Sequence, residues 1–206
     1  VLGTRGKCGA VKELMGGLGG AYETAWRMGG QIRELVQQAG GFEMLQGNIG
    51  LEEAYVGGHR PGKRGRGAAG KTIVMGLKQG DGRIRAEIIG DIKRATLREV
   101  VLRNVEPGSV VSTDELMSYG LLEGDGFTHG KVKHGAKQYA YHDEDSGITH
   151  HVNNVESFWR LFKKSIASTH IHVSQKHMGK YLSEFSFRSN HRAKENAMFD
   201  LLIGAL

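Results

Sequence analysis

The stretch that decides the fold is residues 153–164, with the sequence NNVESFWRLFKK. At about 100° per residue, its apolar side chains fall within roughly one third of a helix circumference, which predicts a helix with one buried face. Those side chains are Val155, Phe158, Trp159, Phe162 and, just beyond the stretch, Ile166. Glu156, Arg160 and Lys163 share the neighbouring face because they stand four and seven residues apart. This acid beside two cations is a candidate functional group, although Asn153 with Glu156 is equally typical of a capping-box start.

The composition is that of a basic globular protein. The chain has 206 residues, of which 39% are apolar and 24% charged, enough for one domain with a real core and a small appendage. Its net charge of +6 favours a polyanionic partner, most simply nucleic acid. A single cysteine, Cys8, excludes an internal disulfide framework and a multi-cysteine zinc site. We expect a cytoplasmic protein with no membrane partner, and an incomplete N-terminus because the chain begins at Val1.

The hydrophobic pattern of the main part predicts an α/β fold with a mixed sheet. The predicted strands span residues 49–56, 72–77, 83–89, 110–113 and 131–139. The predicted helices span residues 96–104, 115–121, 153–164, 176–188 and 193–202. Thr96 and Glu99 have the spacing of a capping box, and QGDG at 79–82 is typical of a hairpin turn. A meander of strands followed by a helix-connected strand predicts helices on both faces of the sheet.

The N-terminal part shows two short helical patterns, at residues 11–15 and 22–36, separated by glycines. Two helices joined by a glycine-containing turn fit a helix-turn-helix, whose second helix would enter the major groove of DNA. A plain helical hairpin packed on the main domain fits the same pattern. The sequence Ala-Gly-Gly at 39–41 indicates a linker, which divides the chain into a DNA-binding segment, residues 1–40, and a core, residues 44–206.

Three acids of the predicted core are candidates for one site. Glu52 and Glu53 are adjacent on the first strand and point to opposite faces, so only one of them enters a given site. Asp114 ends a strand, where sheet proteins commonly carry catalytic residues, and Glu156 lies one turn into its helix. Three convergent carboxylates suit two Mg²⁺ ions about 4 Å apart, an arrangement that serves in-line displacement at phosphorus.

Five short motifs follow one another along the chain. They are YETAWRM at 22–28, EEAYVGG at 52–58 before a basic glycine-rich loop, STDE at 112–115, HVNNVESFWRLFK at 151–163 and HVSQKH at 172–177. In this order they resemble the ISXO-like group of bacterial insertion-sequence transposases. The resemblance runs from about residue 10 to residue 203, and its first motif is similar to the helix-turn-helix ahead of the group's catalytic core.

The resemblance implies a ribonuclease-H-like core and the chemistry of a DDE transposase. Such an enzyme cuts DNA at the ends of its element and transfers the freed 3′-OH strand into target DNA. Glu52, Asp114 and Glu156 would be the catalytic acids and would hold two Mg²⁺ ions, with Mn²⁺ as a substitute. Lys163 maps onto the group's basic residue that contacts end DNA. Double-stranded DNA, a homo-oligomer assembled on it and a nucleoid-associated bacterial protein are further implications.

Two features depart from the group. Its first acid is an Asp where this chain has Glu52, and the extra methylene displaces the carboxylate by about 1 Å, which can cost on the order of 100-fold in rate. A catalytically inactive derivative that only binds DNA is therefore the alternative function. The group often carries a cysteine-rich zinc element ahead of the helix-turn-helix, and Cys8 alone cannot build one.

The basic loop between the first two strands supports two interpretations. GRGAAGKT at 65–72 matches the P-loop pattern, but a β-branched run follows where a P-loop requires a helix. We expect the loop to contact DNA phosphates instead, with a merely solvated loop as the alternative. The predicted DNA contacts are Lys63, Arg64, Arg66 and Lys71 of this loop, Arg27 of the helix-turn-helix, and Arg160 and Lys163.

Histidines and tryptophans complete the set of candidate residues. The histidine spacings match no zinc pattern, and His151 lies nearest to the third acid in the sequence. Trp26 and Trp159 stand on apolar helix faces and are predicted to be core residues, with stacking on DNA bases as the alternative.

Overall fold

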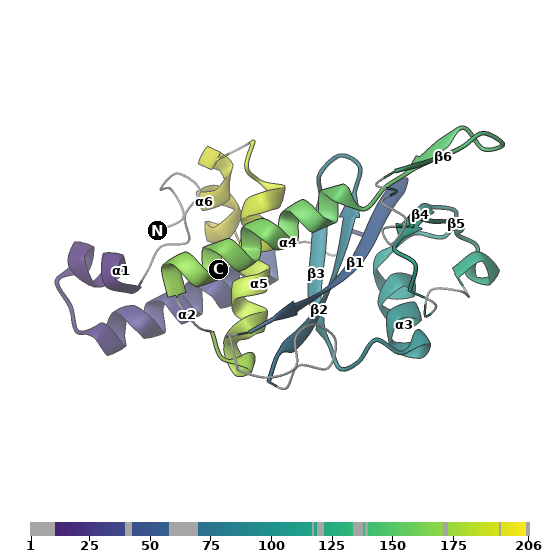
Figure 1. Cartoon of the computed structure of the whole chain (residues 1–206). Helices are drawn as coiled ribbons and strands as arrows, with labels where there is room; N and C mark the ends of the chain where they lie inside the picture. Colours follow the sequence, from purple (N-terminus) through teal and green to yellow (C-terminus); the bar gives the residue numbers. More distant parts are fainter. Residues whose placement is uncertain are drawn as a thin grey trace. The chain divides into compact units, whose positions relative to one another are not determined.

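A computed structural model of the whole chain shows two compact units, each described here by itself (Figure 1). The structure describes residues 11–39, 43–57, 70–116, 118, 122–133, 138, 140–170, 173–193 and 195–204. The sheet unit holds the described residues of 43–56 and 72–160. The helical unit holds those of 1–42, 57–71 and 161–206. The predicted division into residues 1–40 and 44–206 stays a prediction.

The sheet unit is built on a five-stranded mixed sheet, as predicted. Its strands are β1 (Asn48–Val56), β2 (Thr72–Gln79), β3 (Ile84–Ile89), β4 (Val110–Thr113) and β5 (Thr128–Lys131). Their order is β3-β2-β1-β4-β5; β1 pairs antiparallel with β2 and parallel with β4, β2 pairs antiparallel with β3, and β4 pairs parallel with β5. This arrangement is consistent with the ribonuclease-H-like core that the sequence implied.

Helix α3 (Arg94–Asn104) covers one face of the sheet. Its buried side chains Leu97, Val100 and Val101 belong to one apolar cluster with Leu51 of β1 and Met75 of β2. Because β1 and β2 alternate, the side chains between these positions stand on the opposite face. That opposite face carries the candidate site.

The part of helix α4 (Asn153–Ser165) that belongs to the sheet unit covers the second face with Val155 and Trp159 of the predicted apolar stripe. Val155 and Trp159 lie directly over Gly76 of β2, where an added Cβ would stand 2.7 Å from Trp159 Cζ2. Only a glycine allows so close an approach, so Gly76 sets how deeply α4 settles on the sheet. Helices thus flank both faces of the sheet, as expected.

Three details of the sheet unit differ from prediction. The edge strand β5 (Thr128–Lys131) begins three residues before the predicted strand 131–139, because a short, half-exposed edge strand lacks apolar alternation. The prediction of a capping box at Thr96 is wrong, because α3 begins at Arg94. The Thr96 hydroxyl Oγ1 instead donates a hydrogen bond to Asp91 Oδ1 at 2.6 Å. Most of the predicted helix at 115–121 lies outside the described residues.

The remaining elements of the sheet unit lead into α4. A 3₁₀ turn, η2 (Leu122–Asp125), precedes β5. A separate hairpin of β6 (Tyr141–Asp143) and β7 (Ile148–His150) ends three residues before the helix. This hairpin brings His150 onto the face that α4 covers, since the His150 ring lies against Gly130 of β5.

The helical unit contains α1 (Val11–Leu18), α2 (Tyr22–Ala39), the π-turn η4 (Ile166–His170), α5 (Gln175–Asn190) and α6 (Glu195–Ile203). These elements agree with the helical patterns of the sequence. The long helix α2 packs against α5 and α6, and Val36, Phe187, Met198 and Leu202 form its apolar core. No helix in the described part of the chain has the length and apolarity needed to cross a membrane.

Candidate active site

The pairing of β1 with β4 brings together the two segments that carry Glu52 and Asp114. Gly50 of β1 pairs with Ser112 of β4 in the parallel ladder. Glu52 stands two residues further along β1, on the face that α4 covers, and Asp114 directly follows the end of β4. Glu53 pairs with Met75 and belongs to the other face. Glu52, which the family resemblance implied as the first acid, thus lies on the face that α4 covers, and its catalytic role stays a prediction.

Glu52 sits beneath the point where α4 meets the sheet. It pairs across the ladder with Gly76, and the Trp159 indole N–H donates to the Glu52 carbonyl oxygen at 3.4 Å. The Glu52 side chain is half-buried, and its Oε2 is removed from solvent. Because Val155 and Trp159 press on Gly76, the first turns of α4, including the half-buried Glu156, lie above the same part of the sheet.

Asp114 follows β4 directly and is half-buried. Its Oδ1 accepts a hydrogen bond from the backbone N–H of Leu116 at 2.9 Å, which caps the turn that leaves the strand. Asp114 is therefore held in place by its own turn at the end of β4.

The described side chains of Glu52, Asp114 and Glu156 do not form a closed metal cage. Among the described residues, no three His, Cys, Asp or Glu side chains are grouped closely enough to hold a metal ion. Oxygen donors of this kind nevertheless suit Mg²⁺, which proteins often bind through one or two carboxylates plus substrate phosphates. The carboxylates are thus of the donor type that Mg²⁺ takes, but the described side chains do not form a metal site by themselves.

Two histidines that the sequence did not single out brace the end of β4. His150, which is buried, shares a hydrogen bond of 2.9 Å between its Nδ1 and Ser112 Oγ. His129 Nε2 lies 2.9 Å from Thr113 Oγ1. Burial lowers the pKa of both rings, that of His129 to about 4. Both are thus neutral at pH 7, and they hold the two residues that precede Asp114 without adding charge.

His151, the histidine nearest to Glu156 in sequence, has a different position. Its Nδ1 is buried and has no hydrogen-bond partner within the described ranges. No sequence signal distinguishes His150 from His151, because their difference comes from the register of the β6–β7 hairpin. The hydrogen bonds of His129 and His150 to β4 can be recognised only from the three-dimensional arrangement of β4, β5 and β7.

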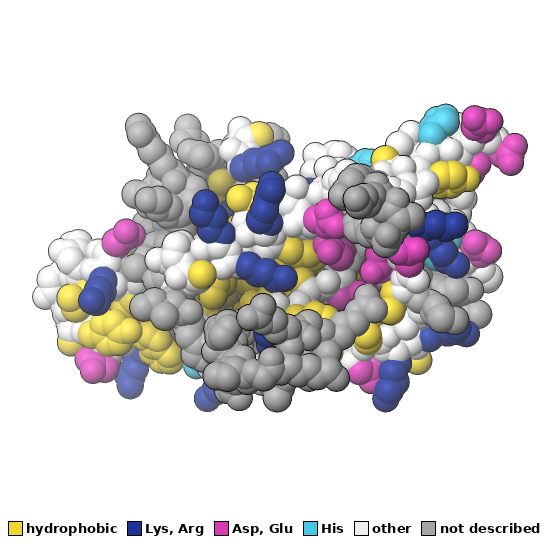
Figure 2. All heavy atoms as spheres, viewed as in Figure 1, with side chains coloured by type: hydrophobic (Ala, Val, Ile, Leu, Met, Phe, Trp, Pro, Cys, Tyr) yellow, Lys and Arg dark blue, Asp and Glu magenta, His cyan; other side chains and the backbone are white. Residues whose placement is uncertain are grey.

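The basic side chains of α4 are exposed. Figure 2 shows Lys and Arg side chains along this helix and Asp and Glu side chains near its first turns. The exposed basic residues of α4 are Arg160, Lys163 and Lys164. Arg160 and Lys163 stand one and two turns after Glu156, as the helical spacing predicted. The basic side chains are thus grouped on the part of α4 that follows Glu156.

The structure describes only some of the other residues that were predicted to contact DNA. Lys63, Arg64 and Arg66 lie outside the described residues. Lys71 is half-buried just before β2, and Arg27 is exposed on α2. Since Thr72 begins a β-strand and not a helix, the P-loop interpretation is wrong. Trp159 is a core residue as predicted, whereas Trp26 is 46% exposed, which contradicts its prediction as core.

Comparison with known proteins identifies the family of the chain. Residues 44–190 match the family described as the ISXO2-like transposase domain. A protein of Haemophilus influenzae named "Uncharacterized transposase-like protein" is 25% identical to the chain over 104 residues. That alignment covers 50% of this chain and 78% of the relative. The matched family region includes all three acids and all five strands of the sheet.

Proposed function

The chain belongs to the ISXO2-like transposase domain family, and from this premise we propose that it cleaves DNA at the ends of an insertion sequence and joins them to target DNA. One observation carries the proposal. The parallel pairing of β1 with β4 brings the strand that bears Glu52 next to the strand that leads into Asp114, in the sheet covered by the helix that bears Glu156. Three carboxylates on neighbouring elements would be a set suited to phosphoryl transfer.

Glu52, Asp114 and Glu156 would hold Mg²⁺, or Mn²⁺ in its place. When bound, the metal would polarise the scissile phosphate and lower the pKa of an attacking water. The chain itself would orient the donors: the β1–β4 ladder joins the two segments that carry Glu52 and Asp114, and Trp159 of α4 packs on Gly76 of β2. His129 and His150 keep the residues before Asp114 in place.

DNA binding would run from these acids along α4. Exposed Arg160 and Lys163 provide cations one and two turns from Glu156, at positions suited to contact successive phosphates. Lys71, Arg27 and the loop residues Lys63, Arg64 and Arg66 are proposed to add phosphate contacts. The helix-turn-helix role of α1 and α2, and a homo-oligomer on paired DNA ends, belong to the same proposal.

The test is Mg²⁺-dependent nicking of supercoiled plasmid by purified protein. We expect nicking by the unmodified chain and its loss in Asp114→Asn and in Glu156→Gln. Glu53→Gln is the matched control, because Glu53 is adjacent to Glu52 but faces α3. Equal nicking by the unmodified chain and Asp114→Asn would refute the assignment of the acids.

The alternative is a derivative that binds DNA without cutting it, and Glu52 is the observation that favours it. The extra methylene moves the carboxylate by about 1 Å, which can cost on the order of 100-fold in rate. Glu52→Asp separates the two functions. A gain of nicking in Glu52→Asp over an inactive parent would identify a decayed enzyme, whereas salt-dependent DNA binding with no nicking in either protein would identify a binding protein.

A further inference from the structure

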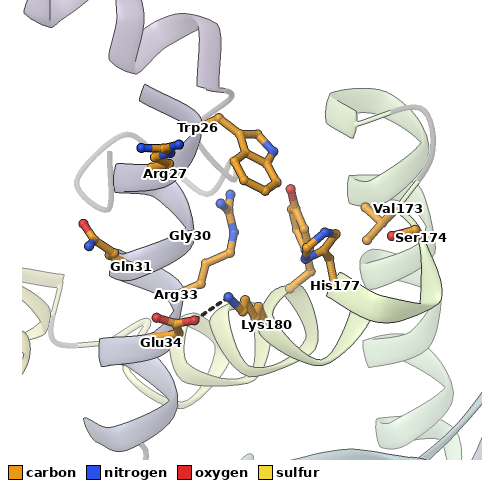
Figure 3. A pocket seen from close by; sticks show the side chains of 11 residues that line it. Trp26, Arg27, Gly30, Gln31, Arg33, Glu34, Val173, Ser174, His177 and Lys180 are labelled. Atoms are coloured by element: carbon orange, nitrogen blue, oxygen red, sulfur yellow. Dashed lines mark hydrogen bonds and ion pairs between the residues drawn. The ribbon is translucent and has the colours of Figure 1, made fainter. Parts of the chain in front are cut away.

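The helical unit contains a pocket of about 500 Å³ between α2 and the beginning of α5 (Figure 3). The side chains that define its chemistry are Trp26, Arg27, Arg33, His177, Lys180 and Tyr181. Its volume lies in the range of sites that hold a small organic ligand. None of the acids assigned to cleavage lines this pocket, so it is a separate feature of the molecule.

One wall of the pocket is aromatic. Trp26 is 46% exposed, and its ring meets the His177 ring edge-on with centroids 5.6 Å apart. The Tyr181 ring lies deeper, beneath the Arg33 guanidinium, whose Cζ is 4.2 Å from the ring centroid. Figure 3 shows the Trp26, Arg33 and His177 side chains gathered at the same pocket. An exposed indole braced by a second ring is a surface on which a planar ligand can stack.

The pocket also favours negative charge. Arg27, Arg33 and Lys180 line it together with a single acid, Glu34, which forms an ion pair with Lys180. Arg33 also forms an ion pair with Glu184, and Arg188 lies near the same carboxylate. These three buried side chains therefore carry one positive charge in excess. Arg27 is exposed and forms no hydrogen bond or ion pair with the described residues. A ligand with an anionic group would find a cation available at the mouth of the pocket.

We propose that this pocket binds one unstacked nucleotide of a DNA strand, with its base against Trp26 and a neighbouring phosphate at Arg27. The proposal rests on the proposed function only in taking DNA as the partner. A base inside a duplex shows neither of its faces, so a stacking pocket selects a nucleotide that has left the helix. A planar aromatic wall combined with a cationic mouth matches the two parts of a nucleotide, a base and a phosphate.

The test compares two DNA ligands in metal-free buffer by fluorescence anisotropy, using the full chain. One is a fully paired duplex, and the other is the same duplex with a few unpaired nucleotides at one end. We expect tighter binding of the second ligand. Trp26→Ala should weaken binding of the unpaired end by about 5- to 100-fold and leave the paired duplex unaffected, because stacking on one aromatic residue contributes that much per base. Trp26→Phe should retain most of the preference.

A matched pair of arginine variants tests the cationic mouth. Arg27→Gln and Arg192→Gln each remove one exposed positive charge from the helical unit, but only Arg27 lines the pocket. Arg27→Gln should reduce the preference for the unpaired end, whereas Arg192→Gln should leave it unchanged. Quenching of tryptophan fluorescence by single-stranded DNA should be seen in the unmodified chain and lost in Trp26→Phe, because Trp159 is buried.

Three results would overturn the proposal. The first is equal binding of the two ligands by the unmodified chain, and the second is an equal effect of Trp26→Ala on both. The third is binding of a free mononucleotide as tightly as the unpaired end, which would assign the pocket to a free nucleotide. Because binding is measured without metal, a failure of plasmid nicking leaves this test intact, and a failure here leaves the nicking result intact.

Discussion

The ion pair between Arg33 and Glu184 joins α2 to α5 inside the helical unit. Arg33 Nε lies 2.7 Å from Glu184 Oε2, and their side chains are only 6% and 3% exposed. Arg188 Nη1 lies 3.8 Å from the other carboxylate oxygen and is 10% exposed. Replacing Glu184 by Gln preserves the shape of the side chain but leaves two buried guanidinium groups facing each other without the intervening carboxylate. We predict that Glu184→Gln strongly destabilises the protein.

The magnitude follows from burial. Removing one partner of a buried pair costs about 3–5 kcal/mol of unfolding free energy, because an uncompensated charge stays in a poorly solvated site. The same two helices offer a matched control in the pair between Glu34 and Lys180, whose side chains are 52% and 32% exposed. Glu34→Gln should cost only about 0.2–1 kcal/mol, since water screens that pair. The two substitutions are chemically identical and differ mainly in burial.

Urea denaturation followed by far-ultraviolet circular dichroism measures both effects. With a denaturant dependence of about 2 kcal/mol per molar urea, Glu184→Gln should lower the midpoint by about 1.5–2.5 M. Glu34→Gln should lower it by less than about 0.5 M. Equal midpoints for the two variants would refute the reasoning, because they would show that water reaches Arg33 and Glu184 as freely as it reaches the surface pair.

Two further predictions concern the sheet unit. Gly76→Ala should destabilise the protein by about 1–3 kcal/mol in thermal denaturation, because its Cβ would stand 2.7 Å from Trp159 Cζ2; an unchanged melting temperature would contradict the close packing of α4. His129 has an ordinary pKa of 6.5 when unfolded and about 4 when folded, so only the unfolded chain gains a proton between these values. Stability should therefore fall as the pH drops from about 6.5 to about 4, and His129→Gln should flatten that decline.

The sequence predicted most of the helices and strands because each has a strong local signal. The stripe of Val155, Trp159 and Phe162 is apolar at helical spacing, and all three residues are buried. The alternation of β1 similarly separated Glu52 from Glu53 before their faces were known. The edge strand β5 was misplaced because its residues make few apolar contacts, so its pattern carries little information.

Local sequence patterns did not predict contacts between segments that are distant in the chain. Trp26 stands at a helical spacing typical of core residues, yet its ring is half-exposed beside His177 of α5. The hydrogen bonds of His129 and His150 to β4 depend on β5 and a separate hairpin. The ion pair of Arg33 with Glu184 joins residues 151 positions apart, and no pattern in either helix indicates it.

The sequence by itself determined the elements and the candidate acids, because periodicity and motif order are local properties of the chain. It also indicated the family, since motifs spread over most of the chain keep their order. Only the tertiary structure decided which face of the sheet Glu52 occupies, which histidines form hydrogen bonds to β4 and where the helical unit contains a pocket. These features depend on strand register and on side chains from distant elements, which sequence spacing does not specify.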